Sequence, residues 1–108
     1  MYSKETIDKT TSMYYWAKSK FDTNPSNEIY FSRYFNLCIN NANDNSFNIE
    51  VRNEYLKECF NILDVYCDYI FLNEDSLQFI KQQQNKVLKA ADNIINFEYD
   101  TLIEQLLN

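Results

Sequence analysis

Five carboxylates in one stretch are the residues of this chain best suited to chemistry. They are Glu50, Glu54, Glu58, Asp64 and Asp68, and all lie within residues 48–73. Grouped carboxylates can transfer protons, hold a hard metal ion or attract a cationic partner. A catalytic carboxylate needs partial burial to shift its pKa. At about 100° per residue, however, these five lie opposite an apolar stripe. The spacing therefore predicts a solvated face, here called the acidic ridge.

An apolar stripe of three- and four-residue spacing runs along the same stretch. It consists of Tyr55, Leu56, Cys59, Phe60, Leu63, Tyr66, Cys67 and Ile70. This spacing predicts one long amphipathic helix over residues 48–73, with Ser46 or Asn48 as its N-cap. The three cysteines of the chain all occupy apolar helical positions, which predicts buried, reduced thiols. Cys59 and Cys67 would be separated by about 12 Å of helical rise, too far for a disulfide.

The absence of two residue types excludes many enzyme classes. The chain has no histidine and no glycine. It therefore lacks an imidazole base, a histidine-bearing metal site, a phosphate-binding glycine loop and a dinucleotide fingerprint. Its cysteines have no Cys-x-x-Cys spacing that would suggest a metal site. We expect no enzymatic activity, no metal and no cofactor.

The net charge is concentrated in the centre of the chain. Residues 1–43 carry +1, residues 44–75 carry −6 and residues 76–108 carry −1. Like charges four residues apart on a helix repel by a few tenths of a kcal/mol, and Glu50, Glu54 and Glu58 have this spacing. The acidic ridge is either a solubilising face or a surface that attracts a basic protein partner. The net charge of −6 argues against direct binding to nucleic acid.

The N-terminal segment predicts a helix over Ser3–Phe21. Its apolar face would contain Ile7, Tyr14, Ala17 and Phe21. The run Met13–Trp16 covers more than half of the helix circumference, so at least one aromatic side chain must pack on another element or face solvent. Tyr15 and Trp16 are the candidates, and we expect them either to cover a neighbouring helix or to form part of a binding surface.

Capping signals divide the rest of the chain. Asn24 and Pro25 predict the start of a second helix that ends near Asn41, followed by a polar loop over residues 40–46. Asp75, with Gln78 three residues later, predicts the start of a C-terminal helix. An unbroken helix from there to Leu107 would extend about 50 Å. We therefore expect a break within residues 93–100, after which Thr101 and Glu104 would cap a short final helix.

The fold class expected is all-α, as a single domain over residues 1–108. Short connections favour a compact antiparallel bundle of four helices, or five if the C-terminal helix is broken near residues 93–100. No apolar run approaches the roughly 20 residues that span a bilayer, and the N-terminus lacks the apolar stretch of a signal peptide. We expect a cytoplasmic protein with no membrane contact. The sequence does not determine the oligomeric state.

These features favour a small acidic inhibitor that neutralises a basic partner. An immunity protein or antitoxin that blocks a nuclease-type toxin fits them best, because a nucleic-acid enzyme offers a basic cleft that carboxylates can occupy. One alternative is a phage-encoded inhibitor of a host nucleic-acid enzyme. Another is a non-enzymatic helical adaptor or oligomerisation module that uses its aromatic residues or its C-terminal apolar group. The residues expected to bind the partner are Glu50, Glu54, Glu58, Asp64, Asp68, Tyr15 and Trp16.

Overall fold

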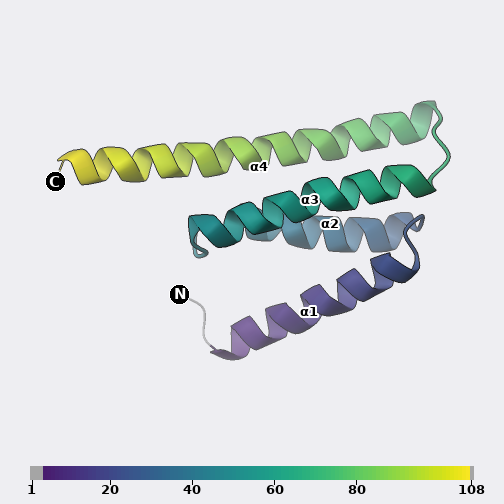
Figure 1. Ribbon diagram of the computed structural model, residues 1–108, viewed down its shortest axis with the longest axis horizontal. Helices are drawn as coiled ribbons and strands as arrows, with labels where there is room; N and C mark the ends of the chain where they lie inside the picture. Colours follow the sequence, from purple (N-terminus) through teal and green to yellow (C-terminus); the bar gives the residue numbers. More distant parts are fainter. Residues whose placement is uncertain (1–3, 108) are drawn as a thin grey trace.

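The computed structural model describes the backbone of residues 4–107 and the side chains of residues 12–107. Over these residues the chain forms four α-helices and no strand (Figure 1): α1 (Lys4–Thr23), α2 (Glu28–Ala42), α3 (Ile49–Tyr69) and α4 (Glu74–Leu107). Successive helices run in opposite directions. The prediction of an all-α bundle of four helices is confirmed. Ser3 and the side chain of Ile7 lie outside the described residues.

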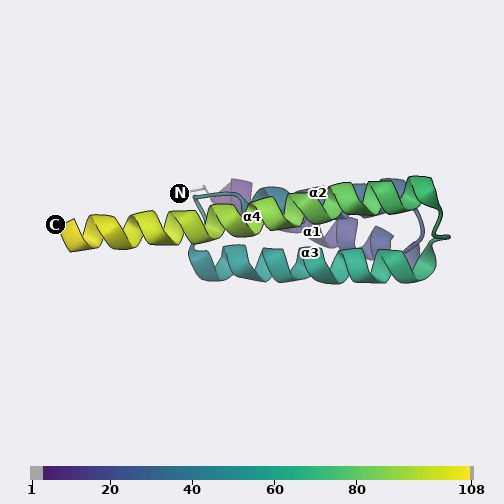
Figure 2. The ribbon, with the colours of Figure 1, turned by 90° about the horizontal axis from the view of Figure 1, so that it is seen from above.

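Helix α2 occupies the centre of the bundle. It contacts α1, α3 and α4, and α3 also contacts α4 (Figures 1 and 2). Among the described residues, the backbone of α1 approaches α2 but neither α3 nor α4. Helices α2, α3 and α4 therefore pack on one another, and α1 lies against one side of α2, where it adds Ala17 and Phe21 to the same core. The backbones of α1 and α3 are therefore separated, and side chains of the two helices border the space between them.

Aromatic rings fill the core. The Phe31 ring lies 4.1 Å from the Tyr66 ring and 5.2 Å from the Phe35 ring, and both pairs are stacked. Leu63 is buried as its place in the stripe predicts, but Phe60 is exposed and Ile62 is buried instead. The buried face of α3 is shifted from the predicted stripe because α2 and α4 both pack on this helix.

Asparagine side chains cap the last three helices. Asn27 Oδ1 accepts from the backbone N–H groups of Ile29 and Tyr30 at the start of α2, at 2.9 and 3.1 Å. Asn48 Oδ1 accepts from the N–H of Val51 at 2.9 Å, which confirms Asn48 as one of the two caps proposed for α3. Each cap satisfies N–H groups that have no partner within their helix.

Two predicted caps are wrong. Asn24 does not begin α2 but closes α1, because its Nδ2 donates to the Lys20 carbonyl at 3.1 Å. Asp75 does not cap α4. Asn73 and Ser76 exchange side-chain and backbone hydrogen bonds of 2.8 and 2.9 Å there, in a reciprocal box that starts the helix two residues earlier than expected. Several adjacent polar residues could cap each helix, and tertiary packing selects among them.

Helix α4 is one unbroken helix of 34 residues. The predicted break within residues 93–100 and the capping box at Thr101 and Glu104 are therefore wrong. The segment contains neither glycine nor proline, and the Thr101 hydroxyl donates to the Phe97 carbonyl one turn earlier, at 2.9 Å. The C-terminal part of α4 continues beyond the other helices (Figures 1 and 2). The radius of gyration is accordingly 15.7 Å, against about 13 Å for a compact chain of this length.

All three cysteines are free thiols. Cys38 and Cys59 are buried, and Cys67 is partly buried. The pKa of Cys38 is raised by its hydrogen bond with Cys59 and by burial, and burial raises the pKa of Cys67. Because the thiolate is the reactive form, these groups are suited to packing. The predicted burial of Cys59 is confirmed, and that of Cys67 holds only in part.

Candidate functional site

The acidic ridge does not keep the uniform solvent exposure that the spacing predicts. Glu50, Glu54, Asp64 and Asp68 are exposed on α3. Glu58 is half-buried, and its Oε1 accepts a hydrogen bond of 2.5 Å from the hydroxyl of the buried Tyr34 on α2. The prediction that Glu58 points away from the core is therefore wrong. The reason is that this side of α3 faces α2, where the buried Tyr34 lies. The backbone of α1 does not approach α3 among the described residues, so the Glu58 side chain has room to reach Tyr34.

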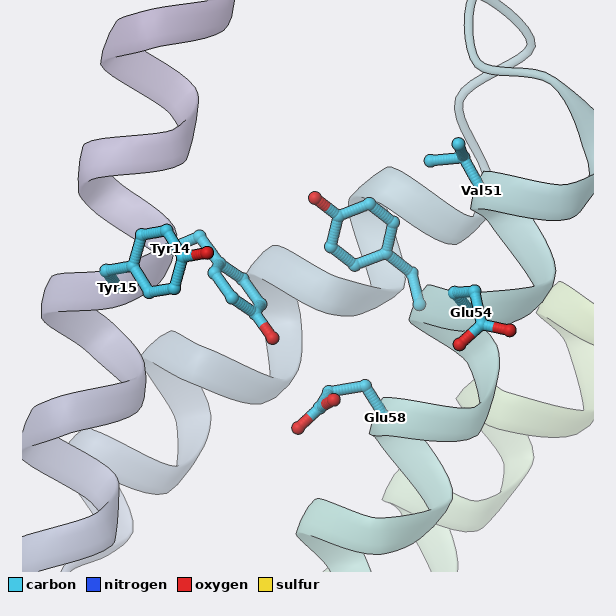
Figure 3. Close-up of a pocket in the computed structure, with 6 residues that line it drawn as sticks. Tyr14, Tyr15, Val51, Glu54 and Glu58 are labelled. Atoms are coloured by element: carbon cyan, nitrogen blue, oxygen red, sulfur yellow. The ribbon is translucent and has the colours of Figure 1, made fainter.

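A pocket between α1 and α3 contains two of the ridge carboxylates. It is lined by Tyr14 and Tyr15 from α1 and by Val51, Glu54, Tyr55 and Glu58 from α3, and its volume is about 410 Å³. Figure 3 shows Tyr14 and Tyr15 facing Glu58 across the pocket, with the Glu58 carboxylate reaching toward α1. We call these six residues the tyrosine–glutamate pocket. The structure thus brings Tyr15, Glu54 and Glu58, three of the predicted binding residues, into one place.

Aromatic contacts hold the walls of this pocket in position. The Tyr14 ring makes edge-to-face contacts with Tyr15, Tyr34 and Tyr55, at centroid separations of 5.3, 5.7 and 5.9 Å. Helical spacing explains why α3 supplies the rest, since residues 51, 54, 55 and 58 recur on one face. The Tyr34 hydroxyl lies 3.4 Å from the Tyr14 hydroxyl as well as bonding Glu58. The Glu58 carboxylate is therefore fixed before any ligand binds.

The phenols of Tyr14 and Tyr55 remain neutral at physiological pH. Burial raises the pKa of Tyr14 and of Tyr55 above the ordinary value of 10.0. The pKa of Tyr34 is raised further, by burial first and by its hydrogen bond to Glu58 second. Neutral aromatic rings attract cations through their faces, and the two carboxylates add negative charge. The pocket therefore suits a guanidinium or ammonium group and disfavours an anion.

The raised tyrosine pKa values predict an alkaline loss of stability. A tyrosine whose pKa is higher in the folded state contributes stability that is complete below the unfolded pKa and is lost as the pH rises through the folded one. The free energy of unfolding should therefore fall above about pH 10. Urea unfolding at a series of pH values measures this. A Tyr34→Phe variant should show a shallower fall, and an equally steep one would contradict the role of Tyr34.

Trp16 lies on a different surface from Tyr15. It borders an apolar hollow of about 410 Å³ between α1 and α2, together with Met13, Ala17 and Leu37. The ring is 5.9 Å from Lys20 Nζ and 5.9 Å from the Arg33 guanidinium carbon. Consecutive residues of a helix point about 100° apart, so Tyr15 and Trp16 do not share one binding face.

The remaining ridge residues are dispersed along α3. Glu50 borders a shallow depression next to the tyrosine–glutamate pocket, and Asp64 borders a groove between α3 and α4. Asp68 is exposed near the end of the helix. Lys57 Nζ lies 3.3 Å from Glu54 Oε1, an exposed ion pair that contributes little to stability. Within the described residues, Glu54 and Glu58 are thus the ridge carboxylates that share a pocket with tyrosine side chains.

The sequence analysis missed the buried Arg52. Its side chain is fully buried, Nε donates to the Ala42 carbonyl at 2.8 Å, and the guanidinium carbon lies 5.2 Å from the Phe97 ring. Among the described residues, the two terminal nitrogens of Arg52 have no hydrogen-bond partner. Arg52 thus places positive charge at the C-terminal end of α2, where unpaired carbonyls carry partial negative charge. Its spacing of seven from Cys59 is a signal that could have placed it on the core face.

The described part of the chain has neither a metal-binding cluster nor a membrane-spanning helix. No three histidine, cysteine or acidic side chains of this part of the chain are grouped so that they could hold a metal ion. No helix within the same residues combines the length and apolar character needed to cross a bilayer.

Comparison with known proteins does not assign the chain to a family. No protein-family model, no curated protein and no solved structure matches the chain. The function must therefore be argued from the tyrosine–glutamate pocket and from the distribution of charge.

Proposed function

We propose that this protein is a small, non-enzymatic inhibitor that binds a basic partner by receiving a lysine or arginine side chain in the tyrosine–glutamate pocket. The observation that carries the proposal is the convergence of Glu54 and Glu58 with Tyr14, Tyr15 and Tyr55 in one preformed hollow. Aromatic faces and carboxylates together are the chemistry that binds such cations. A held carboxylate such as Glu58 loses little freedom on binding, which favours affinity.

The charge of the chain supports a partner that is basic as a whole. The segment with net charge −6 includes all of α3, and Glu50, Asp64 and Asp68 add exposed negative charge along that helix. Complementary charge accelerates association and orients the two proteins, while a central anchor supplies most of the affinity. In this proposal the pocket is the anchor and Glu50, Asp64 and Asp68 attract the partner.

A nucleic-acid enzyme is the class of partner that we favour. Its cleft is basic because it binds phosphates, and carboxylates on a small helical protein can take the place of those phosphates. An immunity protein or antitoxin against a nuclease-type toxin would act in this way, and so would a phage-encoded inhibitor of a host nucleic-acid enzyme. The same chemistry serves both roles, and the identity of the captured partner distinguishes them.

A pair of short peptides tests the pocket without the natural partner. The probes are an acetylated pentapeptide with one central arginine among glycines and the same peptide with citrulline, a neutral group of similar shape. We expect the arginine peptide to bind at about millimolar affinity, to shift the backbone NMR signals of residues 14, 15 and 51–58, and to bind more weakly at higher salt. The citrulline peptide should produce no comparable shifts.

Matched variants locate the binding within α3. Glu54→Gln should weaken binding of the arginine peptide, whereas Asp68→Asn, which removes the same charge outside the pocket, should not. Equal shifts by the two peptides would contradict cation recognition. Equal loss in the two variants would show diffuse attraction to α3 and would remove the pocket from the proposal.

A second candidate function, an oligomerisation or adaptor module, is favoured by a separate observation. Helix α4 exposes apolar side chains along much of its length, and its C-terminal part extends beyond the other helices (Figure 1). Large exposed apolar surfaces usually mark an interaction site. This surface does not border the tyrosine–glutamate pocket, so both functions can exist in one molecule.

A further inference from the structure

Helix α4 carries two apolar stripes, only one of which is buried. The buried stripe faces α2 and α3 and includes Ile80, Val87 and Ile94. The second, called here the outer stripe, consists of Leu77, Gln84, Leu88, Ala91, Ile95 and Leu102. The two stripes lie roughly 100° apart around the helix. Every leucine and isoleucine of the outer stripe is more than half exposed, so no helix among the described residues covers it.

The outer stripe repeats every seven residues. Positions 77, 84, 91 and 98 form one series, and positions 81, 88, 95 and 102 form the other. Five of these eight positions are apolar, namely Leu77, Leu88, Ala91, Ile95 and Leu102, and the spacing of the eight is that of a seam between two packed helices. Two positions of the seam are charged, Lys81 near one end and Glu98 near the other. Their opposite signs select the partner and its direction.

We propose that the occupant of the outer stripe is the α4 helix of a second copy of this chain, packed antiparallel about a centre between Leu88 and Ala91. In this register Leu77 faces Leu102 of the second copy, and Leu88 faces its Ala91. Lys81 faces Glu98 of the second copy, so opposite charges meet twice in the dimer. A parallel pairing would bring Lys81 against Lys81 and Glu98 against Glu98, which is unfavourable.

The same register accounts for the exposed ends of the molecule. Residues after Gln105 extend past Glu74, the start of α4 in the second copy, and reach the connection between its α3 and α4. Leu106, which is 78% exposed, and Leu107 then lie next to Phe71 and Leu72 of that connection, which are also exposed. The apolar C-terminal end of α4 thus contacts an apolar surface of the second copy. A two-fold axis relates the halves, so the assembly closes as a dimer.

A groove beside the outer stripe offers further contact. It lies between α3 and α4, has a volume of about 290 Å³, and is bordered by Leu88 and by the exposed Phe60. A second α4 helix lying on the outer stripe passes along this groove. The groove is separate from the tyrosine–glutamate pocket, so dimerisation does not depend on the proposed inhibitor function; it rests on the second candidate function, the oligomerisation module, and names its partner.

Sedimentation equilibrium of the full chain tests the inference. At concentrations up to about 100 μM we expect a mass twice the 13.0 kDa of one chain. Ile95→Glu should return the mass to that of one chain with an unchanged helical circular-dichroism spectrum. Ile29→Glu, which places the same charge at an exposed isoleucine of α2, should leave the dimer intact. A single-chain mass for the unmodified protein, or a dimer that Ile95→Glu leaves unchanged, would overturn the proposal.

Charge exchange tests the antiparallel register. Lys81→Glu and Glu98→Lys should each raise the dissociation constant of the dimer by about tenfold or more, since like charges then meet at the seam. Both changes in one chain should restore the affinity of the dimer, because Glu at position 81 of one copy then faces Lys at position 98 of the other. A dimer that the single changes leave unaffected, or that the combination fails to restore, would exclude this register.

Discussion

Replacing Phe31 with alanine is expected to lower the free energy of unfolding by about 3–5 kcal/mol. Phe31 is fully buried on the central helix α2, and its ring lies 4.1 Å from Tyr66 on α3 and 5.9 Å from Phe79 on α4. The side chain therefore fills the space where three helices meet. The cavity left by alanine cannot close without separating these helices from one another. The loss is a large part of the stability of a domain of this size.

Urea unfolding followed by circular dichroism measures this change. Ile29→Ala is the matched control, because Ile29 lies on the same helix and is exposed, and we expect it to change stability by less than about 0.5 kcal/mol. Leu63→Ala, on the buried face of α3, should cost about 2–5 kcal/mol. If Phe31→Ala were no more destabilising than Ile29→Ala, the packing around α2 described here would be wrong.

Reversing the charge of Glu54 should weaken binding to the natural basic partner by at least about tenfold, or about 1.4 kcal/mol. Glu54→Lys places a positive charge inside the tyrosine–glutamate pocket, where it repels the basic side chain proposed to enter. The fold should persist because Glu54 is exposed and its ion pair with Lys57 is a surface one. Capture of the partner from host lysate, or titration with the product of an adjacent gene, measures the change at low and high salt.

Asp68→Lys is the control for this experiment. It makes the same change of charge on the same helix at an exposed position outside the pocket, so it should reduce the rate of association more than the affinity. A loss of affinity as large as that of Glu54→Lys would show that the whole ridge binds and that the pocket has no special role. Glu58 is unsuitable for a charge reversal, because Glu58→Lys would also remove the acceptor for the buried Tyr34 hydroxyl.

Secondary structure was largely predictable because it depends on local pattern. The absence of glycine and the spacing of apolar residues were enough to predict four helices and their connections to within a few residues. The caps at Asn24 and Asp75 were mispredicted because a nearby asparagine can cap equally well in each case. Asn27 caps α2 three residues after Asn24, and Asn73 caps α4 two residues before Asp75. The break in α4 was mispredicted because it was inferred from a missing partner for the apolar face. A helix without breaking residues continues whether or not its face is covered.

The candidate site was predictable only in part, because it depends on how α1 lies relative to α3. Glu54, Glu58 and Tyr15 could be nominated from charge and exposure alone. Tyr55 appeared in the sequence only as a member of an apolar face, and Tyr14 only as a member of such a face and as a contact of the alternative adaptor function. The burial of Arg52 and the link between Tyr34 and Glu58 join residues 10 to 24 positions apart in the chain, and helical periodicity carries no signal for such pairs.

The sequence by itself determined the helical class, the acidic character of α3 and the absence of histidine and glycine chemistry, since these follow from residue types and from spacing within single helices. Tertiary structure alone decided which carboxylate is held against the core, which tyrosines surround it and which face of α4 stays uncovered. Each of these depends on the angle and offset between helices. Those are set by how large side chains such as Phe31 and Tyr66 interdigitate across the core, and no single helix specifies them.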